Sequence, residues 1–177
     1  MAQDVDRRGA FEELFNAHYW ALRAYVLRRA PSASAEDVIA ETFLVAWRRL
    51  DSLGDDALPW LFGVARRVMA NQQRADRRRG ALTSRLHGLL PGPAPDWEPP
   101  GAMSEELAIA MATLSPQERE ALLLVAWEGL DGARAARAAG CSPVAFRARL
   151  HRARRHVAAA LADTAIAPKS SIAGESS

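Results

Sequence analysis

The spacing of apolar residues predicts helices along most of the chain. In the first half, apolar positions recur at helical intervals over about residues 6–29, 34–50 and 59–79. Pro31 ends the first of these segments, and Ser34 with Asp37 forms a capping box that opens the second. We find no alternation of apolar and polar residues of the kind that predicts a β-strand, and no internal repeat. The pattern therefore predicts a first group of helices before residue 80.

A second helical group begins near Ser104. Residues 104–114 predict one helix. The next helix opens with Ser115, Pro116 and Glu118, which combine an N-cap, a proline at the first helical position and the acid of a capping box. Between the two groups, repeated prolines and glycines in residues 80–103 disfavour regular structure and predict a semi-extended linker.

The most informative segment runs from Gly129 to His156, where the sequence predicts two short helices joined by a tight turn. Asp131 can cap the first helix, and Gly140 follows its end, where the left-handed conformation is common. Ser142 can cap the second helix, whose apolar face comprises Phe146, Leu150, Ala153 and Val157. This layout is typical of a helix-turn-helix whose second helix enters a DNA major groove.

Together these patterns predict an all-α protein with two small helical domains. We expect a helical bundle over residues 6–79, a Pro/Gly-rich linker over 80–103, a helix-turn-helix domain over 104–162 and a flexible tail over 163–177.

The distribution of charge indicates an anionic partner. The chain has 177 residues and a net charge of only +2, which is too small to indicate nucleic-acid binding by itself. Its 23 basic residues, however, are all arginine except Lys169, and ten of the arginines lie in two dense runs, at 67–79 and 147–155. One such run is readily explained as a solvated helix face, whereas two runs in separate segments favour a binding function.

The sequence offers little that could carry catalysis. A single cysteine, Cys141, allows no internal disulfide and no cysteine-based zinc site. We find no glycine-rich phosphate loop, no zinc-protease helix and no serine-nucleophile turn, and the loop around Asp55 and Asp56 lacks further oxygen ligands for a metal. We therefore expect neither an enzyme nor a cofactor. No apolar stretch is long enough to span a bilayer and no signal peptide is evident, so we expect a cytoplasmic protein without membrane contact.

Three segments, in order along the chain, resemble bacterial extracytoplasmic-function (ECF) sigma factors. AEDVIAETFLVAWRRL resembles the second helix of that family, and WLFGVARRVMANQQRADRRR resembles its promoter-melting helix. LSPQEREALLLVAWEGL followed by AGCSPVAFRARLHRARR resembles its terminal DNA-binding domain. The resemblance implies a fold with a region 2-like bundle and a region 4-like helix-turn-helix, and it implies core RNA polymerase and promoter DNA as partners. It adds an anti-sigma factor as a candidate partner, because many members of the family are held inactive by one.

The resemblance also implies roles for residues of the first domain. Asp37, Glu41 and Phe43 match the patch that grips a coiled coil of the largest polymerase subunits. The loop 51–58 and the helix 60–79 match the element that reads the promoter −10 region. In that element the implied DNA contacts are Arg66, Arg67, Asn71, Arg74, Arg77 and Arg78. Arginines neutralise phosphates whatever the sequence, so Asn71 is the best candidate there for a contact to a base edge.

In the second domain, the resemblance implies that the helix beginning after Ser142 reads the −35 element, and we expect Ser142 itself to be among the DNA contacts. Arg147, His151 and Arg152 match the base-reading positions. Arg149, Arg154 and Arg155 are expected to hold phosphates.

Taken together, the sequence predicts an ECF-type sigma factor that binds core RNA polymerase, recognises −10 and −35 elements and assists DNA melting. Two alternatives remain open at this point. One is a stand-alone helix-turn-helix regulator that binds operators without polymerase, and the other is a helical adaptor that initiates nothing.

Overall fold

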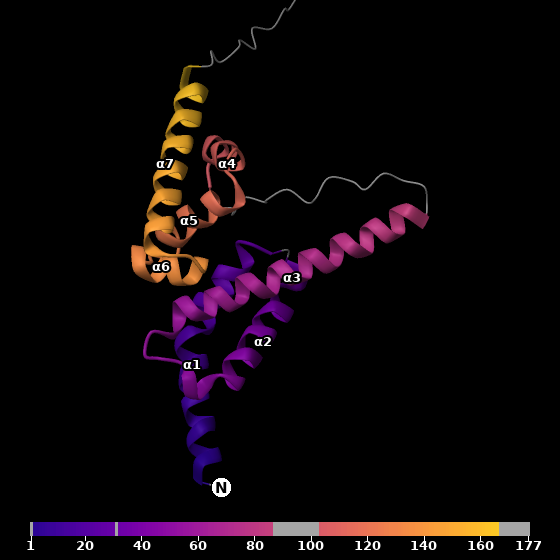
Figure 1. The fold of residues 1–177 in the computed structure, drawn as a ribbon, viewed down its shortest axis with the longest axis vertical. Helices are drawn as coiled ribbons and strands as arrows, with labels where there is room; N and C mark the ends of the chain where they lie inside the picture. Colours follow the sequence, from indigo (N-terminus) through magenta and orange to yellow (C-terminus); the bar gives the residue numbers. More distant parts are fainter. Residues whose placement is uncertain (1, 31, 87–102, 167–177) are drawn as a thin grey trace, which may run out of the picture.

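The computed structural model describes residues 2–30, 32–86 and 103–166, and every regular element in these ranges is helical (Figure 1). The first lobe contains α1 (Ala2–Leu27), α2 (Ser32–Arg48), the short 3-10 helix η1 (Leu50–Ser52) and α3 (Ala57–Leu86). The second lobe contains α4 (Glu105–Ala112), α5 (Pro116–Ala126), α6 (Gly132–Ala139) and α7 (Pro143–Ile166). The predicted all-α fold is confirmed for the described residues.

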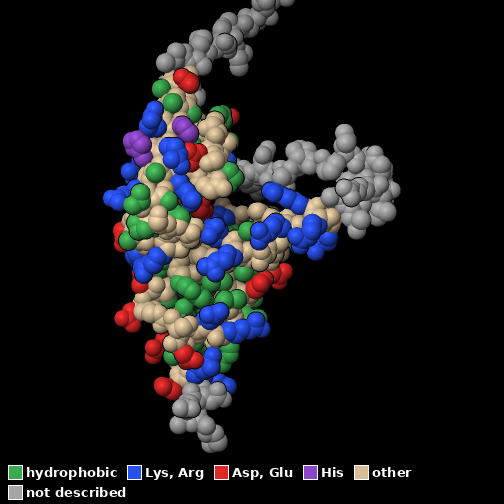
Figure 2. Space-filling model, viewed as in Figure 1, with side chains coloured by type: hydrophobic (Ala, Val, Ile, Leu, Met, Phe, Trp, Pro, Cys, Tyr) green, Lys and Arg blue, Asp and Glu red, His purple; other side chains and the backbone are tan. Residues whose placement is uncertain are grey.

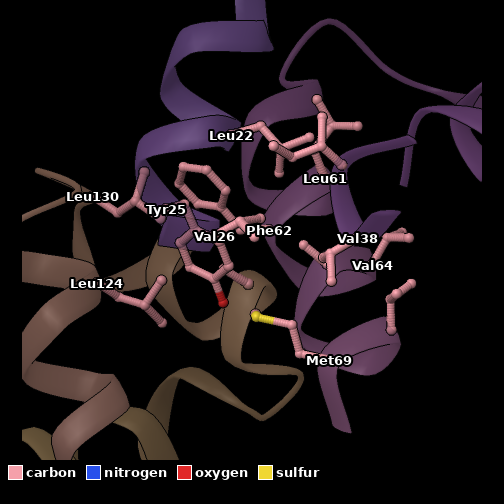
Figure 3. Close-up of a cluster of buried hydrophobic side chains, with 14 of the residues drawn as sticks. Leu22, Tyr25, Val26, Val38, Leu61, Phe62, Val64, Met69, Leu124 and Leu130 are labelled. Carbon is pink, nitrogen blue, oxygen red and sulfur yellow. The ribbon is translucent and has the colours of Figure 1, made fainter. Parts of the chain in front are cut away.

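The first lobe is a helical bundle around an aromatic and aliphatic core. Tyr25 of α1 stacks on Phe62 of α3 with ring centroids 4.3 Å apart, and both side chains are fully buried. Val38 of α2 packs into the same cluster (Figure 3). Apolar residues at helical spacing on all three helices therefore meet in one core, as the sequence pattern predicts.

The second lobe is organised by the caps that the sequence predicts. Ser115 accepts a hydrogen bond from the Glu118 backbone N–H, and the Glu118 side chain accepts from the Ser115 backbone N–H, which completes the capping box. Asp131 accepts from two backbone N–H groups at the start of α6, both at 2.9 Å. Gly140 ends α6 at φ 65°, a left-handed conformation that glycine adopts without steric cost.

The two lobes share one hydrophobic core. Leu124 of α5 and Leu130 after it face Tyr25 and Phe62 of the first lobe (Figure 3). Helix α6 lies against the N-terminal half of α3, where an added Cβ at Gly63 would sit 3.4 Å from the backbone carbonyl oxygen of Ala138. The absence of a side chain at Gly63 therefore lets the two helices approach closely. The lobes are in direct contact, although the linker pattern predicts only a tether between them.

Some helix ends differ from the sequence prediction. Helix α2 begins at Ser32, not Ser34, because Ala33 and Ala35 have high helix propensity and extend the first turn. Helix α3 continues to Leu86, into the segment predicted as linker. The residues between Gly80 and Leu86 include no proline and no further glycine, so the helix is not interrupted there. Helix α7 likewise extends to Ile166, into the predicted tail. The rest of the predicted linker and tail lies outside the described residues.

Candidate nucleic-acid interface

The C-terminal part of α3 projects from the body of the molecule as a basic arm (Figures 1 and 2). Where side chains of α3 are described, through Arg79, buried residues end at Met69. Beyond that point the helix carries mostly exposed polar residues, so the same helix is apolar at its start and basic at its end. The predicted DNA contacts that are exposed here are Arg67, Asn71, Arg74, Arg77 and Arg78.

Three of the predicted contacts on α3 interact with other parts of the protein. Asn71 accepts a hydrogen bond from Arg74 through its side-chain oxygen, which leaves its amide group to donate to a ligand. Arg66 is half-buried and points toward α6, where its guanidinium would lie 2.8 Å from a Cβ added at Gly140. Arg66 therefore lies at the contact between the lobes, and in this arrangement it is not displayed with the other arginines of the arm.

Helix α7 presents a second basic surface (Figure 2). Phe146 and Ala153 anchor it in the core, as the sequence predicts, with Leu150 and Val157 half-buried beside them. Ser142 accepts a hydrogen bond of 3.2 Å from the Ala145 backbone N–H and so caps the helix. The predicted contacts on the exposed surface are Arg147, His151, Arg152, Arg154 and Arg155, whereas Arg149 is half-buried.

Glu118 of α5 contacts two basic residues at one edge of the basic surface on α7. Its carboxylate is buried, accepts from Ser115 and lies 3.5 Å from both the Arg152 Nε and the His156 Nδ1. The hydrogen bonds from Ser115, together with the nearby His156 and Arg152, lower the pKa of Glu118 below its ordinary value. The carboxylate that caps α5 therefore also holds Arg152 against the body of the second lobe.

The outer face of α2 displays acidic and apolar groups together. Asp37 and Glu41 are exposed, as a docking patch requires. Phe43 is only 4% exposed and packs against Phe15 at a centroid distance of 4.7 Å, so the expectation that Phe43 itself contacts a partner is wrong for this arrangement. The large exposed apolar residue of this face is Leu44, at 47%, because it follows Glu41 at the helical interval whereas Phe43 points to α1. The helical period of α2 already places Leu44 on the same face as Glu41.

A buried ionic cluster joins α1 to the second lobe. Arg29 donates to Glu120 at 2.7 Å and to Glu128 at 2.8 Å, and Arg28 pairs with the other oxygen of Glu128. Glu128 is 3% exposed and Arg29 is 7% exposed at the side chain. Burial opposes the charge of Arg29, but Glu120, Tyr25 and Glu128 outweigh it and raise the pKa of Arg29. This cluster is one of two ionic contacts described here that hold the lobes together.

A second ionic contact joins the loop before α3 to α6. Arg134 donates to both oxygens of Asp56, at 2.8 and 3.1 Å, and Arg137 pairs with the same carboxylate. These hydrogen bonds lower the pKa of Asp56 below its ordinary value. The end of the loop that the resemblance assigns to the −10 element is therefore tied to the first helix of the helix-turn-helix, while most of the loop stays exposed. No local pattern could have revealed this contact, because the partners are 78 and 81 residues apart.

The described ranges hold no cluster of three or more residues suited to a metal ion, and none of their helices is long and apolar enough to cross a membrane.

Comparison with known protein families matches both lobes. The model of "Sigma-70 region 2" matches residues 14–79, and the model of "Sigma-70, region 4" matches residues 104–157. Among curated proteins, the ECF RNA polymerase sigma factor SigL of Mycobacterium tuberculosis is 33% identical over 147 residues, which cover 80% of this chain and 83% of SigL. The RNA polymerase sigma factor CarQ of Myxococcus xanthus is 31% identical over 146 residues, covering 81% of this chain and 84% of CarQ.

Solved structures agree with these relatives. The sigma factor RpoE from Bartonella quintana, in complex with the anti-sigma factor NepR, matches with a TM-score of 0.63 and 27% identity over 86% of this chain and 96% of RpoE. CnrH, in complex with the cytosolic domain of CnrY, matches with a TM-score of 0.58 and 26% identity over 88% of this chain and 90% of CnrH. The chain therefore belongs to the sigma-70 family of RNA polymerase sigma factors, within its ECF group.

Proposed function

We propose that this chain binds core RNA polymerase in the cytoplasm, directs it to promoters with −10 and −35 elements, and helps to open the −10 duplex. The observation that carries the proposal is the presence of two separate basic surfaces, on α3 and α7, beside an acidic and apolar face on α2. The chain acts by binding alone, as sigma factors do, and performs no covalent chemistry. We assign polymerase and −10 binding to residues 6–79 and −35 binding to residues 104–162.

The face formed by Asp37, Glu41 and Leu44 is the proposed docking site for polymerase. Two carboxylates beside an exposed leucine suit a partner surface that is basic around an apolar contact. Phe43 supports this face from below by packing against α1, so it positions the face and does not touch the partner.

The arm of α3 is the proposed −10 contact. Arg67, Arg74, Arg77 and Arg78 would neutralise phosphates and hold the strand in place. Asn71 offers amide donors to a base edge. Unstacking a base from a duplex costs a few kcal/mol, so strand capture by this arm and binding energy from the polymerase must supply it together.

On α7, Arg147 and His151 are the proposed readers of the −35 element, with Arg152 at the edge of the surface because Glu118 holds it. Arg154 and Arg155 are the proposed phosphate contacts.

Promoter binding requires the two lobes to separate. The −10 and −35 elements lie about 25 base pairs apart, or roughly 85 Å along a straight duplex at about 3.4 Å per base pair. In the closed arrangement α6 contacts Gly63, and Arg78 lies only about 22 Å further along α3 at about 1.5 Å per residue. In this arrangement the basic surfaces of α3 and α7 cannot reach the two elements at the same time. We therefore infer that it is a state of the free protein, or of a complex with an anti-sigma factor, as in the RpoE–NepR structure.

Run-off transcription with a reconstituted holoenzyme tests the proposal. We expect initiation at a subset of genomic promoters with this chain and none with core polymerase alone. The variant Glu41→Arg should abolish co-purification with core polymerase while keeping the helical circular dichroism spectrum, and Asp163→Arg, an exposed charge reversal on α7, is the control. Specific binding to duplex DNA in gel shifts without polymerase would instead favour a stand-alone regulator. Polymerase binding without initiation would favour an adaptor.

A further inference from the structure

The first turn of α7 displays an apolar side chain on a surface that carries several exposed basic residues. Val144 is 67% exposed, and Ala148, one turn later, is exposed as well. At 3.6 residues per turn, Val144, Ala148 and Arg155 lie on the side of the helix opposite the buried Phe146. Val144 therefore lies at the centre of the outward face, at the end of the helix that enters a groove first in a helix-turn-helix.

The residues around Val144 have other tasks. Ser142 uses its side-chain oxygen to cap the helix, and Pro143 has no backbone N–H to donate. Arg152 lies on the flank, close to Glu118. Arg147 flanks Val144 on the exposed surface one turn along the helix. A valine with a basic residue beside it does not suit an apolar protein groove, but it does suit a surface that is anionic around a small apolar group.

The DNA major groove contains one such group, the 5-methyl of thymine, which lies between the two phosphate backbones. We propose that Val144 is a specificity-determining residue that contacts a thymine methyl in the −35 element. Ala148 extends the contact to a neighbouring position on the same face. The inference rests on the proposed function of α7, and it adds an apolar contribution to a readout otherwise attributed to arginine and histidine.

The experiment removes one methyl group from the DNA. The holoenzyme first selects a preferred −35 duplex from a randomised segment, and each thymine of that duplex is then replaced in turn by deoxyuridine, which lacks only the methyl. We expect one or two positions to lose affinity by about fourfold, the equivalent of about 0.8 kcal/mol for one buried carbon. The variant Val144→Ala should bind the thymine duplex about as weakly as the native protein binds the uracil duplex, and it should no longer distinguish the two.

The matched control is Ile109→Ala, which removes another exposed apolar side chain from the same lobe. It should keep the full preference for thymine, and both variants should keep the native circular dichroism spectrum. Equal affinity for thymine and uracil duplexes, with promoter selection intact, would overturn the role of Val144 and leave the proposed function standing. A preference that survives in Val144→Ala would overturn it in the same way and assign the methyl contact to another residue. Failure of the holoenzyme to select any duplex would refute both.

Discussion

The hydroxyl of Tyr25 on α1 donates a 2.9 Å hydrogen bond to Glu120 on α5, joining residues 95 positions apart. The ring of the same tyrosine stacks on Phe62, and the Arg29 guanidinium lies over it with 3.8 Å between Cζ and the ring centroid. Burial and the Glu120 carboxylate raise the pKa of Tyr25, so its hydroxyl stays protonated and is the donor to Glu120. One side chain therefore links the core of the first lobe to the ionic contact between the lobes.

The variant Tyr25→Phe keeps the ring and removes this donor. We expect it to lower the free energy of unfolding by about 1–3 kcal/mol, because Glu120 is left with one fewer hydrogen bond in a largely buried site. Urea denaturation followed by circular dichroism measures the loss. Tyr19→Phe on the same helix is the control and should change stability by less. Equal effects of the two variants would mean that the Glu120 contact contributes nothing.

The variant Glu128→Ala should open the molecule. It leaves Arg28 and Arg29 with one carboxylate fewer in a buried site, and the loss of one partner from a buried ion pair costs about 3–5 kcal/mol. We expect the distance between spin labels on α2 and α7 to lengthen and broaden. Glu105→Ala, at an exposed position on α4, should leave that distance unchanged. An unaltered distance in Glu128→Ala would show that the shared apolar core alone closes the lobes.

Side-chain size at Gly63 should control the contact between α3 and α6. Gly63→Ala places its Cβ 3.4 Å from the Ala138 carbonyl oxygen and gains about 0.5–1 kcal/mol of helix stability, so we expect the lobes to stay closed. Gly63→Leu cannot fit beneath α6 and should separate the lobes, detected by the same labels. Gly9→Leu on α1, where nothing lies within 4 Å of an added Cβ, is the control.

Acid should weaken the folded protein through His18. Burial lowers the pKa of His18 below its ordinary value of 6.5; Asp56 partly opposes this effect, and Arg134 adds to it. The unfolded chain then binds a proton more readily than the folded one, so stability is complete above the ordinary pKa and falls as the pH drops below it. Urea denaturation between about pH 7.5 and about pH 5.5 should show this decline in the native protein and a smaller one in His18→Gln. An equal decline in stability in the two proteins would show that His18 is not the cause.

The local architecture could be predicted because its signals come from neighbouring residues. The capping box at Ser115 and Glu118, the cap at Asp131 and the left-handed Gly140 each depend on a few adjacent positions, and all are present in the structure. The start of α2 at Ser32 could not be predicted, because the two alanines near the start of the helix are compatible with a first residue at either Ser32 or Ser34.

The contact between the lobes could not be predicted in this way. Asp56 and Arg134 look in sequence like an ordinary loop acid and an ordinary helix arginine, and only the three-dimensional fold places them 2.8 Å apart. For the same reason, the sequence could not show that Arg67 is exposed whereas the adjacent Arg66 of α3 is half-buried. The DNA and polymerase contacts stay predictions until they are measured.

The length and rotation of the projecting arm of α3 are set by its helical register. Each residue of an α-helix advances the chain by about 1.5 Å and turns it by about 100°. Deleting one residue between Met69 and Arg74 would leave the core intact yet rotate Arg74, Arg77 and Arg78 by about 100° around the axis. In the proposed complex, the number of residues between the buried part of α3 and its arginines would therefore set the orientation of DNA relative to the first lobe.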